Sequence, residues 1–387
     1  MKHQVLFFLL VLWGWQLSST TTAQSIENIR FGGYSQIMPL QLNVDFPEPI
    51  GNQSYRELRM QQRLNLFWEV HPSLSITAQS RTRFFTGDLV ETFPGYAQSI
   101  DVDDGYLNLS TMLLESRKSL LHFNADRLFA EWRNETWNVR AGRQRINWGI
   151  NMITNPNDLF NIYSFFEFDY PERPGADALR IQYHADWATR AEVAFAPQQD
   201  LQKSVAAFLY GFNRRGYDIQ LISGYFRNQL AIGGGWAGNL GSAGFKGETM
   251  LFYDLDTSDD EVNVVIAVSV DYMFENALFM IVEGLYNQRG GAGSTTLAAD
   301  GFSASNPSFS RWQLTSQLSY PVSPVLDFSL AGVWFVDEQV IFLSPSISRS
   351  LTQNTDLRFT GQYFVGREAS PLSSFGNLMA LSVRWNF

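Results

Sequence analysis

The sequence contains no cysteine, so neither disulfide bonds nor thiolate metal sites can form. Lysine is almost absent as well. The 28 lysines and arginines include only Lys2, Lys118, Lys203 and Lys246, which leaves 24 arginines. Arginine stays charged and presents a fixed fork of donors, which suits a wall that must remain positive. The net charge is nevertheless −10, which argues against nucleic acid as a partner.

Long hydrophobic runs are missing after the N-terminal region. Residues 1–23 combine Lys2, an apolar run from Val5 to Leu17 and small residues ending at Ala23, the pattern of a secretory signal peptide. That run is too short to span a bilayer, and no later segment is long and apolar enough to form a transmembrane helix. We therefore expect an exported chain with a signal peptide at 1–23 and one domain at 24–387.

Aromatic residues are abundant although the chain is polar on average. They make up 15% of it, with 31 Phe and 11 Trp, while the mean hydropathy is −0.14. Alternation of apolar and polar residues explains both values. Segments 311–320, 355–365 and 262–274 each place apolar side chains on one face and mostly polar ones on the other. Segments of about ten residues with this pattern are typical of tilted strands that cross a membrane.

The pattern predicts an all-β protein, an antiparallel transmembrane β-barrel of about 18 strands, with 16 as an alternative. The connections support this topology, because every second joint is short and the long segments fall at the other joints. The strands are expected to begin near residues 29, 56, 74, 119, 136, 177, 189, 204, 217, 229, 243, 262, 277, 310, 325, 340, 355 and 378. The long joints are 39–54, 88–118, 148–176, 255–261, 289–309 and 366–377.

The last segment, "NLMALSVRWNF", carries aromatic or apolar residues at alternate positions and ends on Phe387. It resembles the assembly signal of Gram-negative outer-membrane barrels, which implies a location in the cell outer membrane. A soluble β-sandwich or propeller is the alternative. That fold would need a second apolar layer over the outer face, and no segment remains to supply one. In lipid, only closure of the sheet satisfies every backbone group.

A barrel of this width keeps an aqueous lumen, and the first strand follows the expected cleavage site too closely for an N-terminal plug domain. A diffusion channel is therefore the expected function. Arginines are concentrated in the strands of residues 56–145, which predicts a basic wall, and later strands add charges of both signs, among them Glu248, Glu283, Arg358 and Arg384. Alternatively, the arginines pair with neighbouring carboxylates and only stabilise the barrel. The predicted pore-lining residues are Arg59, Arg63, Arg81, Arg83, Arg140, Arg143, Arg145, Arg180 and Arg190.

The segment 148–176 is the third outer connection. In general porins this loop folds inward and constricts the channel, and that resemblance implies polar residues facing the arginine wall. The alternative is a loop packed on the rim or on a neighbouring subunit. The residues assigned to this constriction are Asn155, Asn157, Asp158, Glu167, Asp169 and Glu172.

Strict alternation creates a conflict before this loop. If Arg140 points inward, Arg143 and Arg145 point into the membrane, at a cost of about 2–4 kcal/mol each near its midplane. Either a bulge at Ala141-Gly142 reverses the orientation of the following residues, or the strand has already reached the outer rim.

An enzyme is the competing class of protein. After the signal peptide only His71, His122 and His184 remain, and none has a recognisable serine or metal partner in the sequence. Acidic clusters in the outer connections, such as Asp101 with Asp103, could bind cations that bridge lipopolysaccharide, but they match no calcium-loop motif. We expect no catalytic residue, no metal and no cofactor.

The string "GRQRINWG" followed by "NPND" resembles a motif of uncharacterised porin-like outer-membrane proteins, similar in style to the alginate-export and phosphate-selective porins. The resemblance implies a porin for ions or small hydrophilic solutes. An export channel for an acidic polysaccharide, and a structural or adhesive barrel with a closed lumen, remain alternatives. The expected partners are outer-membrane lipid, lipopolysaccharide and small hydrophilic or anionic solutes, and a homo-oligomer stays open.

Overall fold

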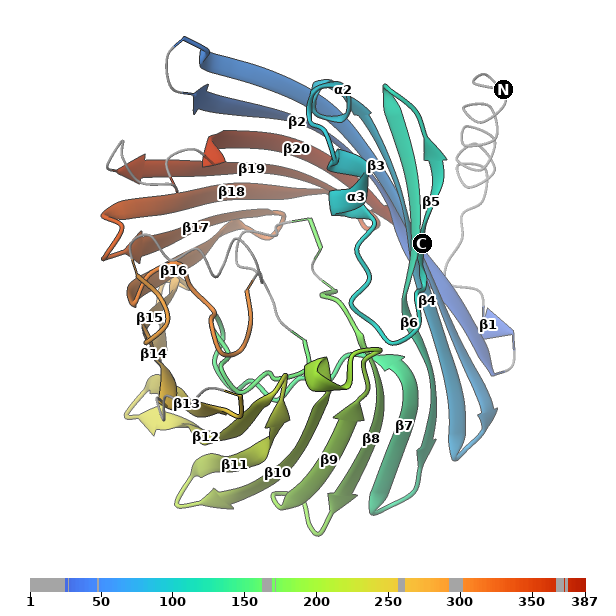
Figure 1. The fold of residues 1–387 in the computed structure, drawn as a ribbon, viewed down its shortest axis with the longest axis vertical. Coiled ribbons are helices and arrows are strands. Elements are labelled where there is room, and N and C mark those ends of the chain that lie inside the picture. Colours follow the sequence, from blue (N-terminus) through green and yellow to red (C-terminus); the bar gives the residue numbers. More distant parts are fainter. Residues whose placement is uncertain are drawn as a thin grey trace.

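The computed structural model describes residues 25–26, 28–46, 49–161, 169–170, 172–256, 262–291, 302–366, 372 and 375–387. Within these residues one antiparallel sheet contains 20 strands, of which 18 form a closed barrel. Strands β2 (Ile29–Phe46) and β20 (Asn377–Asn386) pair with each other and close the ring, with Ile37 opposite Val383 (Figure 1). No described helix is long and apolar enough to cross a membrane.

Each barrel strand pairs with the next one along the chain. The remaining barrel strands are β3 (Gly51–His71), β4 (Leu74–Gly87), β6 (Ser119–Arg133), β7 (Trp137–Gln144), β8 (Ala176–His184), β9 (Arg190–Ala196), β10 (Val205–Arg214), β11 (Tyr217–Phe226), β12 (Gln229–Leu240), β13 (Ala243–Asp254), β14 (Val262–Met273), β15 (Phe279–Asn287), β16 (Trp312–Ser323), β17 (Leu326–Phe335), β18 (Val340–Thr352) and β19 (Thr355–Gly366). Two strands lie outside the ring order, β1 (Ser25–Ile26) and β5 (Ser110–Glu115). The described helices are α2 (Asp88–Thr92), α3 (Tyr96–Ile100) and the 3-10 turn η1 (Leu201–Lys203).

The prediction of 18 barrel strands is confirmed, and the predicted starts agree with the observed ones within two residues except in β3. The expected long joint at 39–54 is wrong. Strands β2 and β3 continue until Phe46 pairs with Gly51, so only residues 47–50 connect them. The strands extend because inward side chains such as Leu40 and Val44 remain buried along this part of β2.

The outward face of the barrel is a band of apolar side chains. Leu179 of β8 lies opposite Phe195 of β9, and Leu314 of β16 lies opposite Trp334 of β17, and all four are exposed. A continuous apolar exterior of this size is not found on a soluble monomer. Outward apolar positions that alternate with inward polar ones are typical of a barrel embedded in a membrane.

Strand β5 lies within the expected outer loop 88–118 and was not predicted. Strand β7 pairs only with residues 128–133 of β6, because the chain turns inward after Gln144. Strand β5 pairs with residues 120–124 of β6 and so continues the line of β7 along the same edge. It therefore supplies hydrogen-bond partners to the backbone groups of β6 that lie beyond the end of β7.

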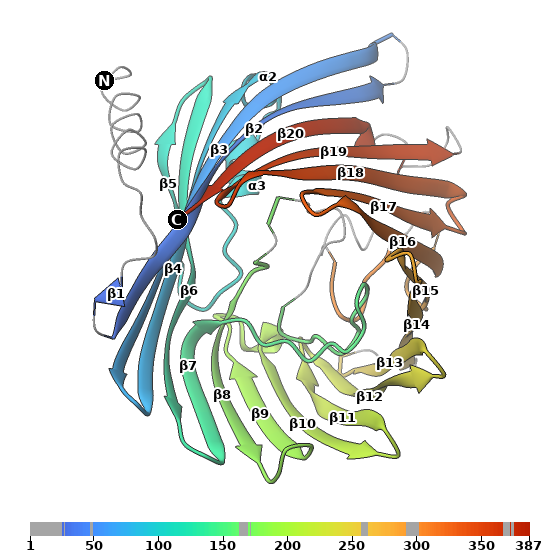
Figure 2. The same ribbon diagram turned by 180° about the vertical axis from the view of Figure 1, so that it is seen from behind.

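Several connections at the outer end, the end with the long joints, lie inside the ring. Figures 1 and 2, taken from opposite sides, show α3 and the described residues that follow β7 within the projected barrel. Leu89 of α2 packs with Met38 and Leu40 of β2. Ala97 of α3 packs with Phe85 of β4. The interior is therefore filled by connections on several sides.

Candidate functional site

The chain after β7 crosses the interior of the barrel. Residues 145–161 lie on the inner face of β8–β15, where Ile146, Trp148 and Leu159 are almost fully buried among apolar inward side chains. The indole N–H of Trp148 donates to Glu192 of β9. The side chain of Gln220 of β11 donates to the backbone carbonyl of Trp148 at 2.6 Å. The segment is thus packed against one half of the barrel wall.

Two carboxylates of the wall hold this segment by its backbone. Glu248 of β13 accepts hydrogen bonds from the N–H groups of Asn151 at 2.7 Å and Asn157 at 2.9 Å. Glu283 of β15 accepts from the N–H group of Thr154 at 3.0 Å. Both carboxylates are almost completely buried. Charge-assisted bonds to backbone N–H groups are stronger than neutral ones, so the wall fixes the path of the segment.

The later part of the same connection meets the arginine wall. Asp169 accepts a hydrogen bond from Arg59 at 3.0 Å. The ring of Tyr170 lies 3.7 Å from the guanidinium carbon of Arg81. Glu172 accepts a hydrogen bond from the hydroxyl of Tyr34 at 3.3 Å. The connection therefore reaches from the wall of β8–β15 to the wall of β2–β4. Glu167 lies outside the described residues.

The predicted constriction residues Asn155, Asn157 and Asp158 do not lie against the arginine wall. Asn157 and Asp158 are buried against the wall of β8–β15, and Asn155 packs beside Gly149. The Oδ1 and Nδ2 atoms of Asn157 have no hydrogen-bond partner among the described residues. Burial raises the pKa of Asp158 to about 8, although the cation of Arg145 partly offsets this effect.

Most of the predicted pore arginines form ion pairs or hydrogen bonds with other residues. Arg63 is almost fully buried and pairs with Asp126. Arg83 donates to the backbone carbonyl of Ile100. Among the described residues Arg81, Arg145 and Arg190 have no ion pair within 4.0 Å. The other ion pairs of these arginines are Arg59 with Glu57 and Asp169, Arg63 with Glu172, Arg140 with Glu131, Arg143 with Asp103 and Asp177, and Arg180 with Glu192.

The register of β7 shows why Arg143 does not point into the membrane. Within the described strands β6, β7 and β8 the pairing runs without a shift through Gly142, so the bulge expected there is absent. Gly142 instead has φ 119°, and a side chain there would lie 2.3 Å from the carbonyl oxygen of Leu128. Arg143 is the penultimate residue of β7, and its charge is matched by Asp103 and Asp177. It therefore lies at the rim, where the strand ends.

His122 has a serine partner that the sequence did not reveal. Its Nε2 lies 2.7 Å from the Oγ of Ser110 and 3.3 Å from Asp101, and its Nδ1 lies 3.1 Å from Arg83. An arginine N–H only donates, so Nδ1 accepts and Nε2 carries the proton. Nε2 then cannot take a proton from Ser110. In a hydrolytic triad the carboxylate holds Nδ1 instead, so this cluster ties the outer connection to the wall.

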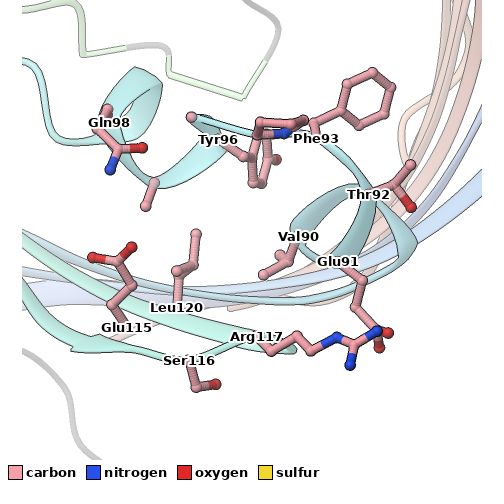
Figure 3. A pocket seen from close by; sticks show the side chains of 13 residues that line it. Val90, Glu91, Thr92, Phe93, Tyr96, Gln98, Glu115, Ser116, Arg117 and Leu120 are labelled. Carbon is pink, nitrogen blue, oxygen red and sulfur yellow. The ribbon is translucent and has the colours of Figure 1, made fainter.

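The described residues at the outer end line two cavities. One of about 950 Å³ is lined by four connections, with Asp101 and Asp104 on one side and Lys203 and Arg289 among its basic residues. The other, of about 650 Å³, lies between the α2–α3 segment and the turn that joins β5 to β6 (Figure 3). The second cavity has Leu120 in its lining and contains none of the predicted site residues.

Arg358 and Arg384 are functional candidates that the list of predicted pore residues omitted. Alternation places both inward, and the structure puts them on neighbouring strands, β19 and β20. Arg384 donates to Gln36 at 2.9 Å and lies over the ring of Tyr34. Among the described residues neither arginine has a carboxylate at ion-pair distance. The charge pattern of the later strands did place both arginines among the lumen charges, although neither was selected as a pore residue.

A closed, 18-stranded antiparallel barrel with an apolar exterior and an inward connection has a porin-like transmembrane β-barrel fold. Solved structures show the same fold. The outer membrane protein OpdK of Pseudomonas aeruginosa superimposes with a TM-score of 0.56 at 8% identity, over 92% of this chain and 98% of that one. OccAB4 of Acinetobacter baumannii gives 0.55 at 9% identity, over 95% and 100%. No protein-family model matches the sequence, and no curated protein matches it.

Proposed function

We propose that the protein is an outer-membrane channel for ions and small hydrophilic or anionic solutes, and that residues 145–175 narrow its lumen. The proposal includes removal of residues 1–23 and insertion of residues 24–387 as the mature barrel. A closed barrel with an aqueous lumen lets solutes diffuse without an energy source. The porin fold is consistent with this activity.

The polar inner face of β18 and β19 carries the proposal. The inward residues Ser344, Ser346 and Ser348 of β18 are only partly buried, and Arg358 of β19 is exposed. The described residues 145–161 of the inward segment pack on the opposite wall, on the inner face of β8–β15, and do not cover these residues. An inner face of hydroxyls and an exposed guanidinium favours contact with water rather than with a packed core.

Charged groups of both signs line the proposed path. Arg358 and Arg384 have no carboxylate at ion-pair distance among the described residues, whereas Arg63 is neutralised by Asp126. Asp169 and Glu172 carry negative charge on the connection that reaches the arginine wall. Together with Arg81, Arg145 and Arg190, which also have no ion pair among the described residues, Arg358 and Arg384 support a modest preference for anions.

Planar-bilayer recording of the refolded mature chain tests the proposal. We expect stable conductance steps in symmetric salt and, in a salt gradient, a reversal potential displaced towards the equilibrium potential of the anion. A barrel that inserts into the bilayer yet conducts no ions would contradict the proposal and favour a structural role. In a second assay, the swelling rate of liposomes that contain the protein compares the permeability to neutral sugars with the permeability to charged solutes.

A further inference from the structure

The larger cavity at the outer end, which we call the outer cavity, borders the inward segment. Its volume is about 950 Å³, within the range of about 300–1,000 Å³ that ligand pockets of proteins have. Phe226 in its lining belongs to the same cluster of buried apolar residues as Trp148 and Leu159 of the inward segment. A solute in the outer cavity is therefore held beside this segment, at the outer entrance to the lumen.

The lining of the outer cavity is polar on all sides. Among its described residues Phe226 is the only large apolar one, and it is almost fully buried. A solute with an apolar body would find few apolar contacts here, whereas each side-chain amide offers both a donor and an acceptor. The amide residues of the lining are Asn108, Gln198, Gln199, Gln229 and Asn306.

The charges around the outer cavity nearly cancel. Its lining contains four aspartates and three basic residues. Asp103 pairs with Arg143, and Arg289 pairs with Asp254. These two partners bring the count to five acidic and four basic side chains. Rings of charge of one sign select ions, so a nearly balanced lining favours a neutral solute.

Hydrogen bonds hold the lining connections in place. The side chain of Gln198 donates to the backbone carbonyl of Asp104 at 2.6 Å, which joins the connection before β10 to the connection before β5. The side chain of Asn263 of β14 donates to the backbone carbonyl of Ser305 at 2.7 Å. The outer cavity is thus formed before a ligand arrives, and a preformed site loses less conformational entropy on binding.

Three polar side chains of the lining can bind a ligand without losing a partner. The side chains of Asp104, Gln199 and Lys203 form no hydrogen bond or ion pair with any described residue. All three are exposed. Asp104 lies on one connection and the other two residues lie on another, so these groups approach a solute from two connections.

We propose that the outer cavity binds a neutral polyhydroxylated solute, a di- or trisaccharide, before the solute enters the lumen. The inference rests on the proposed channel function and adds the class of solute that the channel takes up. Hydroxyl groups of a sugar each donate and accept, which matches amide and carboxylate groups that present two polar atoms side by side. A site that hydrogen-bonds hydroxyl groups discriminates against solutes that lack them.

Titration calorimetry with raffinose, maltotriose and cellobiose in turn tests the inference. The refolded mature chain is kept in micelles of tetraethylene glycol monooctyl ether, because the head group of this detergent is not a sugar. We expect saturable binding of at least one of the three sugars. If none of them binds, the inference is wrong.

Gln199→Leu should weaken sugar binding about three- to tenfold, because the hydrogen bonds of one exposed amide are lost. Gln98→Leu is the matched control. Gln98 is exposed as well but lines the smaller cavity (Figure 3), so this variant should bind the sugar as the native chain does. Equal affinities of the two variants would show that the sugar does not occupy the outer cavity.

Two measurements test whether the bound solute is neutral. Asp104→Asn should leave the affinity nearly unchanged, because an amide also presents two polar atoms and a neutral ligand gains nothing from the charge. High salt should leave it unchanged too, since salt screens only interactions between charges. Trigalacturonate, which carries carboxylates, should bind more weakly than maltotriose. Tighter binding of trigalacturonate would assign the outer cavity to anions and overturn the inference.

Permeability separates failure of this inference from failure of the proposed channel. If liposomes that contain the protein swell in sugar but none of the three sugars shows saturable binding, the inference is wrong and the channel function holds. If a sugar binds but the protein gives neither swelling nor conductance, the binding site is confirmed. Its role in uptake then fails together with the proposed channel.

Discussion

Both carboxylate oxygens of Asp126 accept hydrogen bonds from the guanidinium of Arg63, at 2.6 and 3.2 Å. The hydroxyl of Tyr170 donates to the same carboxylate at 2.7 Å. Asp126 therefore joins an arginine of β3 to the inward connection, and both charged side chains are almost completely buried. The pair fixes the place where the connection meets the wall.

Asp126→Asn should destabilise the barrel strongly. The substitution removes the nearest negative charge and leaves the buried guanidinium of Arg63 with only Glu172, 4.0 Å from its Nε, and breaking such a buried pair costs about 3–5 kcal/mol. Urea unfolding in detergent micelles, followed by tryptophan fluorescence, measures the loss. Asp169→Asn is the matched control, since Asp169 pairs with the more exposed Arg59 and should lose less. Equal losses from the two variants would show that burial of the Arg63 pair does not set its contribution.

Replacing Arg358 and Arg384 with serine should move the reversal potential of the channel towards the cation. These guanidinium groups lack a carboxylate at ion-pair distance among the described residues, so their charge acts on passing ions. Arg349→Ser is the control, because Arg349 lies on the outward face near the turn into β19. If the reversal potential of the double variant equals that of the native channel, these arginines do not line the path of ions.

Glu248→Gln should loosen the inward segment without unfolding the barrel. One carboxylate oxygen becomes an amide nitrogen that cannot accept, so at least one backbone N–H of the segment 150–157 loses its bond, at about 1–3 kcal/mol. Single-channel recording should show larger or noisier conductance. Glu135→Gln changes an exposed residue in the opposite turn and should behave as the native chain. If the conductance of Glu248→Gln equals that of the native channel, the hydrogen bonds of Glu248 do not determine the width of the pore.

Asp158 should make packing of the inward segment weaker as the pH rises. Its pKa is raised from 3.8 to about 8 by burial, so the folded protein holds a proton that the unfolded chain has already released. Between about pH 4 and pH 8 stability therefore falls with increasing pH, at most by about 1.4 kcal/mol per unit. Asp158→Asn should flatten this slope in unfolding experiments at several pH values. A slope unchanged by the substitution would assign the effect to other groups.

Gly142→Ala should cost more than an ordinary glycine substitution. At φ 119° an added Cβ would meet the carbonyl oxygen of Leu128 at 2.3 Å, so strain of about 1–3 kcal/mol is joined by a backbone clash. Gly216→Ala is the control. Gly216 has φ 80° in a turn with nothing within 4 Å, so only the conformational strain remains. Thermal unfolding of both variants should rank Gly142→Ala as the less stable, and the reverse order would contradict the clash.

The sequence by itself determined the class of fold, the order of the strands and the face to which most side chains point. These properties depend on alternation within single strands, as in 311–320, and on the lengths of the connections. Closure then follows because lipid offers no partner to an open sheet edge. The end of β2 and the start of β3 were misplaced, since nothing in their own residues marks where their pairing stops, and β5 was missed.

The tertiary structure alone decided which charges meet. Arg63 finds Asp126 on β6 and Glu248 finds backbone N–H groups almost a hundred residues away, because these contacts depend on the register of the barrel and the path of a connection. The tertiary structure also shows that the arginine at the end of β7 is held by Asp103 and Asp177 at the rim. Side-chain alternation predicts the face to which a residue points but not which residues lie close to it. The register between paired strands determines those distances.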